Sequence, residues 1–480
     1  MCSFFFLRMT QPVSSETVSE ANRFAKDRGP DSTGMLQFQD RAGYHCCFVH
    51  NLLDISGQAV QQPLVSGSAG DRTVLLFNGE IYNHRELHNS LADTECVLPV
   101  LGQSWELAAS RLQGEYAIAI YQERQSLLKV LVDPFLTKPL FWGRSDKPGE
   151  FGVATCASSL RAAGLSNVQM VQPNSKSVIE LLQTEVQITS GADVCQFSLR
   201  QDEASCDAWI SSFTESVRRR ATHGRQPICV FLSSGYDSGA ICLALNLLKI
   251  PYTTLSIVGH ESASILQERC RLNRQAVRAK SIRFDGLSGV QSAEITQDIQ
   301  RHVEPFDYQH EDRPGYTLPV SQDGGAIGAW FLAQQARKNS LLVNLSGSGA
   351  DEIVSDYGFA GRPMYHHSQF GGLFPTTLDG FFPWKKFYGD TQRSYLFKDE
   401  YILGRFGLEG RYPFLAHDVV QQFLHLTPQL KNSRYKAPVA VFLERYGYPF
   451  EESVKRGFSP ARAEGRLGRM MRVLGFGGAR

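Results

Sequence analysis

Short runs of β-branched and aromatic residues, separated by turn residues, recur through the first 190 residues of the chain. Such runs are typical of strands, and we expect strands at 44–49, 73–77, 115–121, 127–132, 178–182 and 185–188. Few stretches in this part have helical spacing. The pattern predicts an N-terminal α+β domain over residues 1–190, built as a sandwich of antiparallel sheets.

The pattern changes after 191–205, a polar stretch with a Ser-Gly pair that we interpret as a linker. Apolar runs then alternate with segments of helical spacing. We expect strands at 228–232, 253–257, 281–284 and 341–345, and helices at 207–222, from 238 onward, and at 264–280, 294–303 and 326–338. This alternation predicts a parallel sheet covered on both faces. Residues 206–480 thus form an α/β domain whose part after 395 is mainly helical, and we expect the Gly- and Arg-rich tail after Gly465 to be disordered.

Composition narrows the function only by exclusion. The net charge of the 480 residues is +1 and the basic clusters are short, which argues against a nucleic-acid partner. No apolar run approaches the length of about 20 residues that crosses a bilayer. The run near the start is also too short for a signal peptide. All ten cysteines precede residue 271 and none forms a CxxC pair, so we expect reduced thiols, no membrane partner and a cytoplasmic location.

The second residue, Cys2, is a candidate nucleophile. Removal of Met1 would leave Cys2 with a thiol and a free α-amine. That amine has an ordinary pKa of about 8 and can accept the thiol proton near neutral pH. One residue would then supply both the nucleophile and its base.

Four motifs accompany this cysteine: RGPDSTG at 28–34, FNGEIYN at 77–83, ADTEC at 92–96 and KPLFW at 138–142. Together with Cys2 they resemble the glutaminase domain of class II glutamine amidotransferases. The resemblance implies an N-terminal-nucleophile fold in which Cys2 attacks the glutamine amide and Asn78 with the Gly79 N–H stabilises the oxyanion. It places Arg28, Asn78, Glu80 and Asp93 at the bound glutamine, with Asp93 on its α-amine.

One element of that family's pattern is missing. The family usually carries an Arg that pairs with the α-carboxylate of glutamine, whereas this chain has VHNLLD at 49–54. Loss of a bidentate, charge-assisted contact weakens glutamine binding unless another donor replaces it. The residues therefore leave two interpretations open: an active glutaminase, or a glutaminase fold that no longer turns over.

The second domain begins with a turn of the phosphate-binding type. FLSSGYDSG at 231–239 follows an apolar run and opens a helix, and such a turn directs backbone N–H groups at phosphates. It resembles the Ser-Gly-Gly-x-Asp-Ser-Ser turn of asparagine synthetases. LSGSGADE at 345–352, EPFD at 304–307, GLEGRYPFL at 407–415 and KRGFS at 455–459 resemble further motifs of that family, so the likeness extends over nearly the whole chain.

The resemblance implies that a carboxylate is adenylated by ATP, with release of pyrophosphate, and that an amine then forms an amide. Asp237 and Asp351 match the aspartates that hold Mg²⁺, and oxygen ligands suit that ion. Lys455 matches the lysine that neutralises developing charge. The implied ATP-binding residues are Leu232, Ser233, Ser234, Gly235, Asp237, Ser238, Ile257, Ser346 and Gly347.

The chain also departs from asparagine synthetases. Ser348 stands where those enzymes have a glutamate that acts as a base, and a neutral hydroxyl cannot replace it. Glu352 is the candidate acid nearby. Ser234 replaces a glycine and is tolerated only if its φ is negative. Glu400 and Tyr401 replace an Asp-Arg pair, and residues 308–322 resemble an inserted loop. We take Ser348, Glu352 and this loop to select the carboxylate substrate.

Our leading hypothesis is an amide-forming ligase that uses ATP and Mg²⁺, with glutamine and a small carboxylate, aspartate or another, as substrates. A homodimer is an assembly that the resemblance allows. One alternative is a carboxylate–amine ligase of the lactam or peptide type whose glutaminase half is idle. Another is a degenerate homologue that binds ligands without catalysis, which the substitutions at Ser234 and Ser348 favour.

Overall fold

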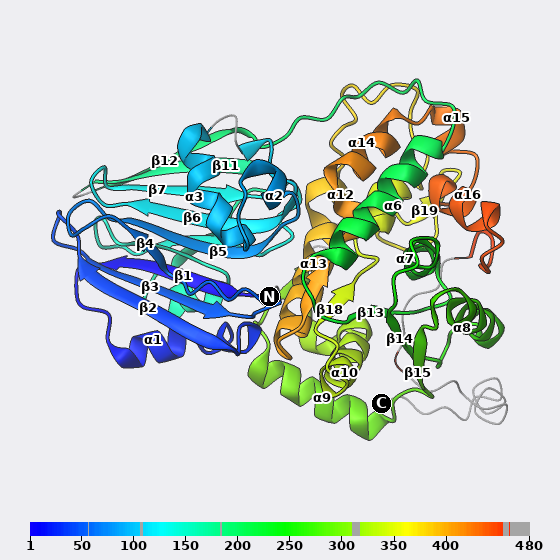
Figure 1. Ribbon diagram of the computed structural model, residues 1–480, viewed down its shortest axis with the longest axis horizontal. Helices are drawn as coiled ribbons and strands as arrows, with labels where there is room; N and C mark the ends of the chain where they lie inside the picture. The colour runs from blue at the N-terminus through cyan, green and yellow to red at the C-terminus, as the bar shows by residue number, and fades with distance from the viewer. Residues whose placement is uncertain (56, 106–108, 183–184, 310–316, 455–459, 461–480) are drawn as a thin grey trace.

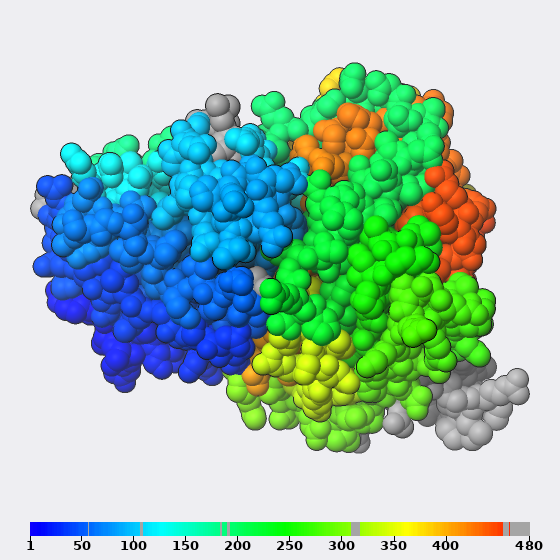
Figure 2. Space-filling model, viewed as in Figure 1, coloured from blue at the N-terminus to red at the C-terminus, as the bar shows by residue number. Residues whose placement is uncertain are grey.

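The computed structural model describes residues 1–55, 57–105, 109–182, 185–309, 317–454 and 460. Figure 1 shows two antiparallel sheets stacked on one side and an α/β domain on the other. In space-filling view the two domains adjoin along a seam (Figure 2). Among the described residues, no helix is long and apolar enough to cross a membrane.

Two six-stranded antiparallel sheets form the N-terminal domain. The order across the first sheet is β10 (Asn167–Met170), β8 (Phe141–Arg144), β9 (Phe151–Ala154), β1 (Ser3–Met9), β3 (His45–Leu52) and β2 (Ser32–Gln39). The order across the second is β12 (Val186–Asp193), β11 (Ser175–Leu181), β7 (Leu127–Val132), β6 (Gly114–Gln122), β5 (Thr73–Ile81) and β4 (Leu64–Ser66). The sandwich predicted from the sequence is confirmed.

Alternation along the strands explains the layers, because successive side chains of a strand face opposite sides. Phe4 and Phe6 of β1 pack between the sheets, whereas Phe5 faces outward. The outer faces are covered by short helices. These are α1 (Ser15–Ala21) and α5 (Ala157–Ala162) on one side and α2 (His84–Leu87) and α3 (Asp93–Gln103) on the other, with the 3-10 turn η1 (Lys26–Arg28) near the seam.

A five-stranded parallel sheet is the centre of the second domain, as predicted. Its order is β15 (Lys280–Phe284), β14 (Thr253–Ile257), β13 (Ile228–Phe231), β18 (Val343–Leu345) and β21 (Glu409–Arg411). Cys229 and Val230 of β13 belong to cores on opposite faces of this sheet. Two small hairpins lie outside it: β16 (Asp307–Gln309) with β17 (Thr317–Pro319), and β19 (Gly358–Phe359) with β20 (Arg362–Pro363).

Helices cover both faces of the parallel sheet. The core on one face contains residues of α6 (Asp207–Thr222), α7 (Tyr236–Leu247), α8 (Ala263–Val277), α11 (Ala350–Val354), α12 (Lys385–Tyr388), η3 (Pro413–Leu415), α14 (His417–His425) and α16 (Ala437–Arg445), with α15 (Pro428–Lys431) beside it. The helices α9 (Gly289–His302), α10 (Gly324–Lys338) and α13 (Asp390–Gly404), with the turn η2 (Val320–Gln322), supply cores on the other side.

The domain boundary lies slightly later than predicted. Strand β12 continues to Asp193 because its residues pair with β11 through Ser175, so the connection to α6 begins after 193 rather than at 191. Of the expected inserted loop at 308–322, the two flanks pair as the hairpin of β16 and β17, and 310–316 lie outside the described residues. The expected disordered tail after Gly465 also lies outside them.

Candidate functional site

Cys2 immediately precedes β1 and lies in a small pocket at the seam between the domains. The Leu53 N–H donates to its Sγ at 3.4 Å. The pocket, of about 30 Å³, is lined by Cys2 together with Gly79, Glu80 and Asp93. Burial raises the pKa of the Cys2 thiol to about 11 and lowers that of the α-amine of the preceding Met1 to about 6. A base beside the thiol is therefore needed before Cys2 can attack.

Asn78, expected from the motifs as an oxyanion donor, lies next to Gly79 of the Cys2 pocket but is not among the residues that line it. Its side chain is fully buried, and neither Nδ2 nor Oδ1 has a hydrogen-bond partner among the described residues. A buried amide without partners is unfavourable by a few kcal/mol, so a group that accepts its N–H is stabilised there. Gly79 follows with φ of 133°, a conformation that a side chain would strain.

Arg28 does not lie where the glutamine contact was expected. Its Nη2 pairs with Glu400 of α13 at 2.8 Å, and its Nη1 donates to the Glu400 carbonyl at 2.6 Å. Its Nε donates to the Cys2 carbonyl at 3.3 Å. Lys138 of the KPLFW motif binds the same carboxylate at 2.9 Å. Both cations thus tie the domain of Cys2 to the second domain through Glu400. From the sequence, Glu400 stood out only because it and Tyr401 replace an Asp-Arg pair of the family.

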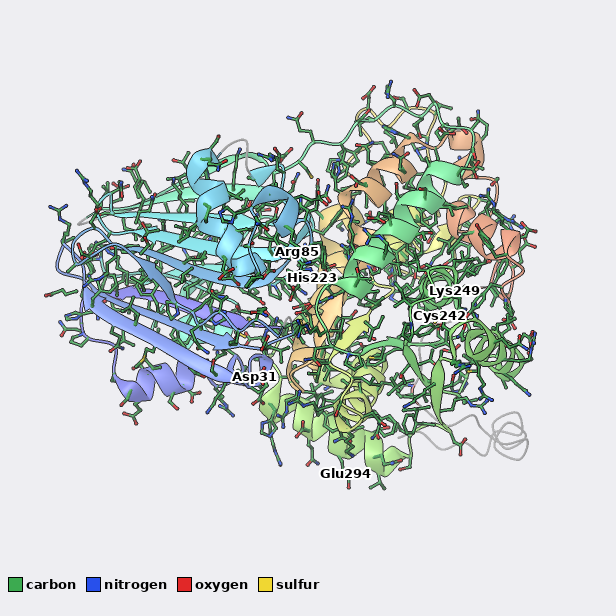
Figure 3. All side chains as sticks on the ribbon, viewed as in Figure 1. Asp31, Arg85, His223, Cys242, Lys249 and Glu294 are labelled. Carbon is green, nitrogen blue, oxygen red and sulfur yellow. The ribbon has the colours of Figure 1, made fainter. Side chains whose placement is uncertain are left out.

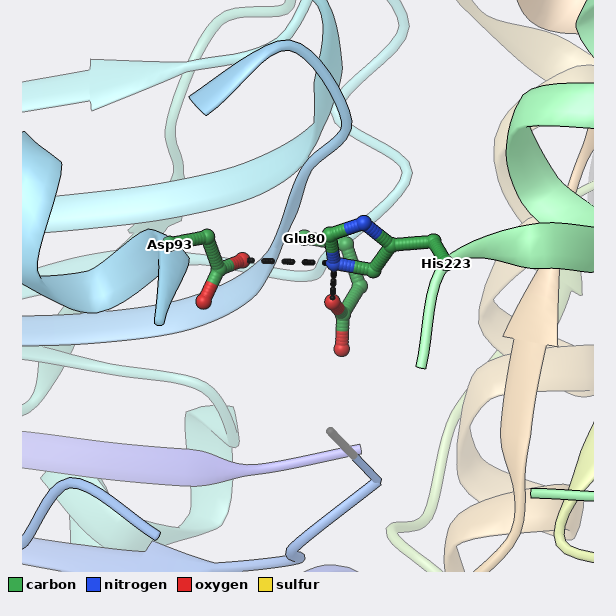
Figure 4. Close-up of side chains that lie close together, drawn as sticks. All are labelled: Glu80, Asp93 and His223. Carbon is green, nitrogen blue, oxygen red and sulfur yellow. Dashed lines mark ion pairs between the residues drawn. The ribbon is translucent and has the colours of Figure 1, made fainter. Parts of the chain in front are cut away.

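The two acids of the Cys2 pocket meet a histidine from the other domain. His223, the residue after α6, places Nε2 2.5 Å from Glu80 Oε2 and 3.9 Å from Asp93 Oδ2 (Figure 4). Burial and the Glu80 carboxylate raise the pKa of Asp93 to about 7. Burial lowers the pKa of His223, but the Glu80 carboxylate opposes it and the net pKa is raised. Nothing in the sequence motifs indicated His223.

The phosphate turn joins β13 to α7. Ser238 Oγ accepts from the Ser233 N–H at 3.1 Å, and the Gly235 N–H donates to Ser233 Oγ at 3.1 Å. Leu232 and Ile257 are buried beside the turn at the ends of β13 and β14. The turn therefore holds its shape with its own hydroxyls, and it leads directly into the twelve-residue helix α7.

Ser234, which replaces a glycine, has no positive φ. Its backbone therefore accommodates a side chain at this position, as the sequence required. The Ser234 N–H donates to Glu261 Oε2 at 2.6 Å, and its hydroxyl bonds the same carboxylate. The substitution thus adds an anchor between the phosphate turn and the segment before α8.

Asp237 and Asp351 converge at the carboxyl ends of neighbouring strands β13 and β18. Lys436 Nζ lies 2.6 Å from Asp237 Oδ1 and 2.8 Å from Asp351 Oδ1, and the Tyr435 hydroxyl donates to Asp351 at 2.9 Å. Gly347 lets the two turns approach, since a Cβ there would lie 2.7 Å from Asp237 Cβ. The two carboxylates share the Lys436 ammonium, and their oxygens are ligands of the kind that Mg²⁺ prefers.

Ser348 is paired with an acid that the motifs did not reveal. Its hydroxyl donates to Asp399 Oδ2 at 2.6 Å, and the Ser346 hydroxyl donates to the same atom at 2.7 Å. Burial raises the pKa of Asp399 above its ordinary value. Glu352, the acid considered from the sequence, is buried and accepts from the Tyr357 hydroxyl.

Many of these groups line one cavity of about 330 Å³, although Leu232, Ser234, Ser238, Ile257, Ser346 and Asp399 are not among its lining residues. It is lined by Ser233, Gly235, Tyr236, Asp237, Asp323, Gly325, Gly347, Ser348, Asp351, Glu352, Tyr357, Tyr365, Tyr395, Lys398, Tyr435, Lys436 and Val454. Lys455 lies outside the described residues. The cavity has the size of a small-molecule site and combines a phosphate turn, two convergent carboxylates and several tyrosines.

Comparisons with known proteins agree with both halves of this arrangement. Residues 1–197 match the family of glutamine amidotransferase domains, and 208–399 match asparagine synthase. A putative glutamine-hydrolysing asparagine synthetase 1 of Methanocaldococcus jannaschii is 23% identical over 462 residues, which cover 88% of this chain and 79% of that protein. The glutamine-hydrolysing asparagine synthetase of Gallus gallus is 23% identical over 90% of this chain and 78% of its own length.

Asparagine synthetase 1 of Bacillus subtilis is 25% identical over 76% of this chain and 60% of its own length. A solved glutamine phosphoribosylpyrophosphate amidotransferase from B. subtilis aligns over 59% of this chain and 90% of its own with a TM-score of 0.35, too low a value to argue from. The sandwich with a nucleophile pocket, joined to a parallel sheet with a phosphate turn, defines a two-domain amidotransferase. The chain is a divergent member of the glutamine-hydrolysing asparagine synthetase family.

Proposed function

We propose that this protein is an ATP-dependent, amide-forming ligase that takes its nitrogen from glutamine. Water and glutamine give glutamate and ammonia at Cys2. A carboxylate and ATP give an acyl-AMP and pyrophosphate in the second domain, and ammonia displaces AMP to leave the amide. The observation that carries the proposal is the meeting of Asp237, Asp351 and Lys436 beside the phosphate turn, in a chain that also places Cys2 beside Asp93.

The residues of the first domain act on the proton and the oxyanion. The α-amine exposed when Met1 is removed takes the thiol proton of Cys2 and later returns it to ammonia. Asn78 Nδ2 and the Gly79 N–H donate to the oxygen of the tetrahedral intermediate. Asp93 accepts from the α-ammonium of glutamine, which fixes the amide against Cys2.

The residues of the second domain hold the phosphates and the acyl group. Asp237 and Asp351 would hold Mg²⁺, which supplies positive charge to the departing pyrophosphate. Lys436 adds a second positive charge at the same place, and Lys455 is proposed for the charge on the intermediate. Asp399 accepts a hydrogen bond from Ser348, which stands in place of the missing glutamate base, and it can accept the proton released when the amide forms.

The carboxylate substrate is proposed to be small and different from aspartate. Ser348 and the tyrosines Tyr357 and Tyr395 border the cavity, and hydroxyls with aromatic rings favour a less charged acid than aspartate. Efficient conversion of aspartate to asparagine with glutamine, ATP and Mg²⁺ would overturn this part of the proposal.

The test of the whole proposal is a two-product assay. Wild-type protein is expected to form glutamate from glutamine and, with an accepted acid, pyrophosphate from ATP. Cys2→Ala should lose glutamate formation and keep pyrophosphate formation with ammonium salts, whereas Asp237→Asn should do the reverse. Loss of both products in either variant would contradict the division of labour.

A carboxylate–amine ligase with an idle glutaminase domain is the second candidate. The small volume beside Cys2 and the contact of His223 with Glu80 favour it. Pyrophosphate formation with an organic amine, without any glutamate from glutamine in the wild type, would establish this alternative.

A further inference from the structure

The turn at residues 223–225 belongs to the second domain but lies at the mouth of the Cys2 pocket. A larger cavity of about 430 Å³ lies outside that pocket, and both are lined by Gln58, Ala92 and Asp93. His223 and Arg225 also line the outer cavity. Figure 3 shows His223 close to the seam between the domains, with Arg85 on the side of the first domain. Asp93 therefore borders a cavity to which both domains contribute side chains.

The turn packs directly on the wall of the Cys2 pocket. A Cβ on Gly224 would lie 2.9 Å from the carbonyl oxygen of Ile55, and the Arg225 N–H donates to that oxygen at 3.5 Å. The side-chain Cδ of Arg225 runs 3.8 Å from where a Cβ on Gly57 would be. Ile55 itself lines the Cys2 pocket. The Arg225 side chain thus begins against the same segment that encloses the nucleophile.

Charge pairing leaves few cations of the outer cavity free. Arg218 and Arg219 both bond Glu215, at 2.6 and 2.8 Å. His223 is held by Glu80. Among the described residues, the side chains of Arg225 and Arg85 have no hydrogen-bond or ion-pair partner. Arg225 bonds Ile55 of the Cys2 pocket through its backbone N–H, whereas Arg85 lies on α2 of the first domain, beside His223 at the seam (Figure 3).

Glutamine brings one positive and one negative group to this place. His223 neutralises Glu80, so Asp93 remains for the α-ammonium. The α-carboxylate then needs a cation, and none of the described side chains that line the Cys2 pocket is basic. We propose that Arg225 binds the α-carboxylate of glutamine, so that the second domain completes the glutamine site of the first. This inference rests on the proposed glutaminase function, and a guanidinium suits the task because it bonds a carboxylate through two N–H groups.

The experiment compares glutamine with 4-aminobutanamide, which keeps the amide and the ammonium but lacks the α-carboxylate. Ammonia release is measured with full-length protein lacking Met1, in the wild type and in Arg225→Ala, Arg225→Lys and Arg85→Ala. Charge-assisted bonds contribute about 1.5–3 kcal/mol. Arg225→Ala should therefore lower kcat/KM for glutamine by about 10- to 150-fold, mainly through KM, and change 4-aminobutanamide less than about twofold.

Two controls separate this role from a structural one. Arg225→Lys should recover part of the glutamine activity, and Arg85→Ala should change neither substrate by more than about twofold. An equal loss for glutamine and 4-aminobutanamide, or no loss with glutamine, would overturn the assignment of Arg225. So would a selective glutamine defect in Arg85→Ala.

A binding measurement distinguishes failure of the inference from failure of the proposed function. Calorimetry with Cys2→Ala protein reports glutamine binding without turnover. If wild type releases no ammonia from either amide but glutamine still binds, and binds at least about tenfold more weakly to Cys2→Ala/Arg225→Ala, the proposed function falls and the inference stands. Absence of glutamine binding to the Cys2→Ala protein would overturn both.

Discussion

The hydroxyl of Ser348, which lines the cavity of the second domain, donates to Asp399 Oδ2 at 2.6 Å. If Asp399 accepts the proton released during amide formation, Asp399→Asn should lower the rate of amide formation from ammonia by about 100-fold. Pyrophosphate release from ATP and the acid should fall much less, because adenylation precedes that proton transfer.

A rapid-quench measurement of the two products separates these steps. Ser346→Ala offers a matched control, since it removes the other hydroxyl on Asp399 and leaves Ser348 in place. An Asp399→Asn protein that forms amide at the wild-type rate would remove Asp399 from the mechanism.

The dependence of glutamine hydrolysis on pH should report Asp93. Burial and Glu80 raise its pKa to about 7, and only the ionised form holds the α-ammonium of glutamine. Because the acid is protonated below that pKa, kcat/KM for glutamine should rise as pH increases through about 7 and then level off.

Glutaramate, which lacks the α-amine, is the control for this profile. It should not show the rise that belongs to Asp93, although it shares any rise due to the Cys2 thiol and its base. Identical profiles for the two amides would assign the titration to the nucleophile instead.

Glu400 is expected to carry much of the stability of the domain interface. It bonds Arg28 at 2.8 Å, Lys138 at 2.9 Å and the Tyr412 hydroxyl at 2.9 Å, and its side chain is fully buried. Removing one partner of a buried ion pair typically costs about 3–5 kcal/mol, since the other charge is left uncompensated. Glu400→Gln should lower the free energy of unfolding by that order.

Denaturant titration followed by fluorescence gives the measurement. Glu215→Gln is a suitable comparison, because Glu215 pairs with Arg218 on a partly exposed helix face and such pairs contribute about 0–1 kcal/mol. Equal changes in the two variants would show that burial of Glu400 adds nothing.

Gly347 allows the phosphate turn and the Asp351 turn to meet. A methyl group there would lie 2.7 Å from Asp237 Cβ, closer than such atoms approach. Gly347→Ala should therefore displace Asp237 and reduce pyrophosphate formation by at least about tenfold, while glutamate formation in the other domain stays within about twofold.

Assays of both products on the same preparation check this. Gly289→Ala, in the same domain, is the control and should keep pyrophosphate formation, because a Cβ there meets no atom within 4 Å. Unimpaired pyrophosphate formation in Gly347→Ala would mean that the two turns can move apart without loss of activity.

Local pattern was enough to predict much of the fold. The strand 253–257 and the helix 207–222 appear with the expected bounds, because apolar spacing and flanking turn residues define both. Strands such as β1 were not anticipated, although their apolar runs are present, since Phe4, Phe5 and Phe6 are apolar on both faces and lack the alternation of a half-exposed strand.

The candidate site was predicted less completely than the fold. Motifs indicated Cys2, Asp93, Asp237 and Asp351, which stand beside distinctive residues at the start of a strand or a helix. Lys436 and Asp399 could not be found this way, because each is an ordinary charged residue whose partner is distant in the sequence. His223 and Arg225 depend on how the two domains meet, and nothing local encodes that contact.

The apolar packing between the two domains has a consequence for how this protein can be handled. Leu53, Ile55 and Phe135 of the first domain belong to the main core of the second domain, and Arg28 ends on Glu400. A proteolytic nick in the connection before α6 should therefore leave both fragments associated, whereas expressing either fragment alone would expose apolar surface and strand charged groups without partners. The chain is in this sense one folding unit with two reaction centres.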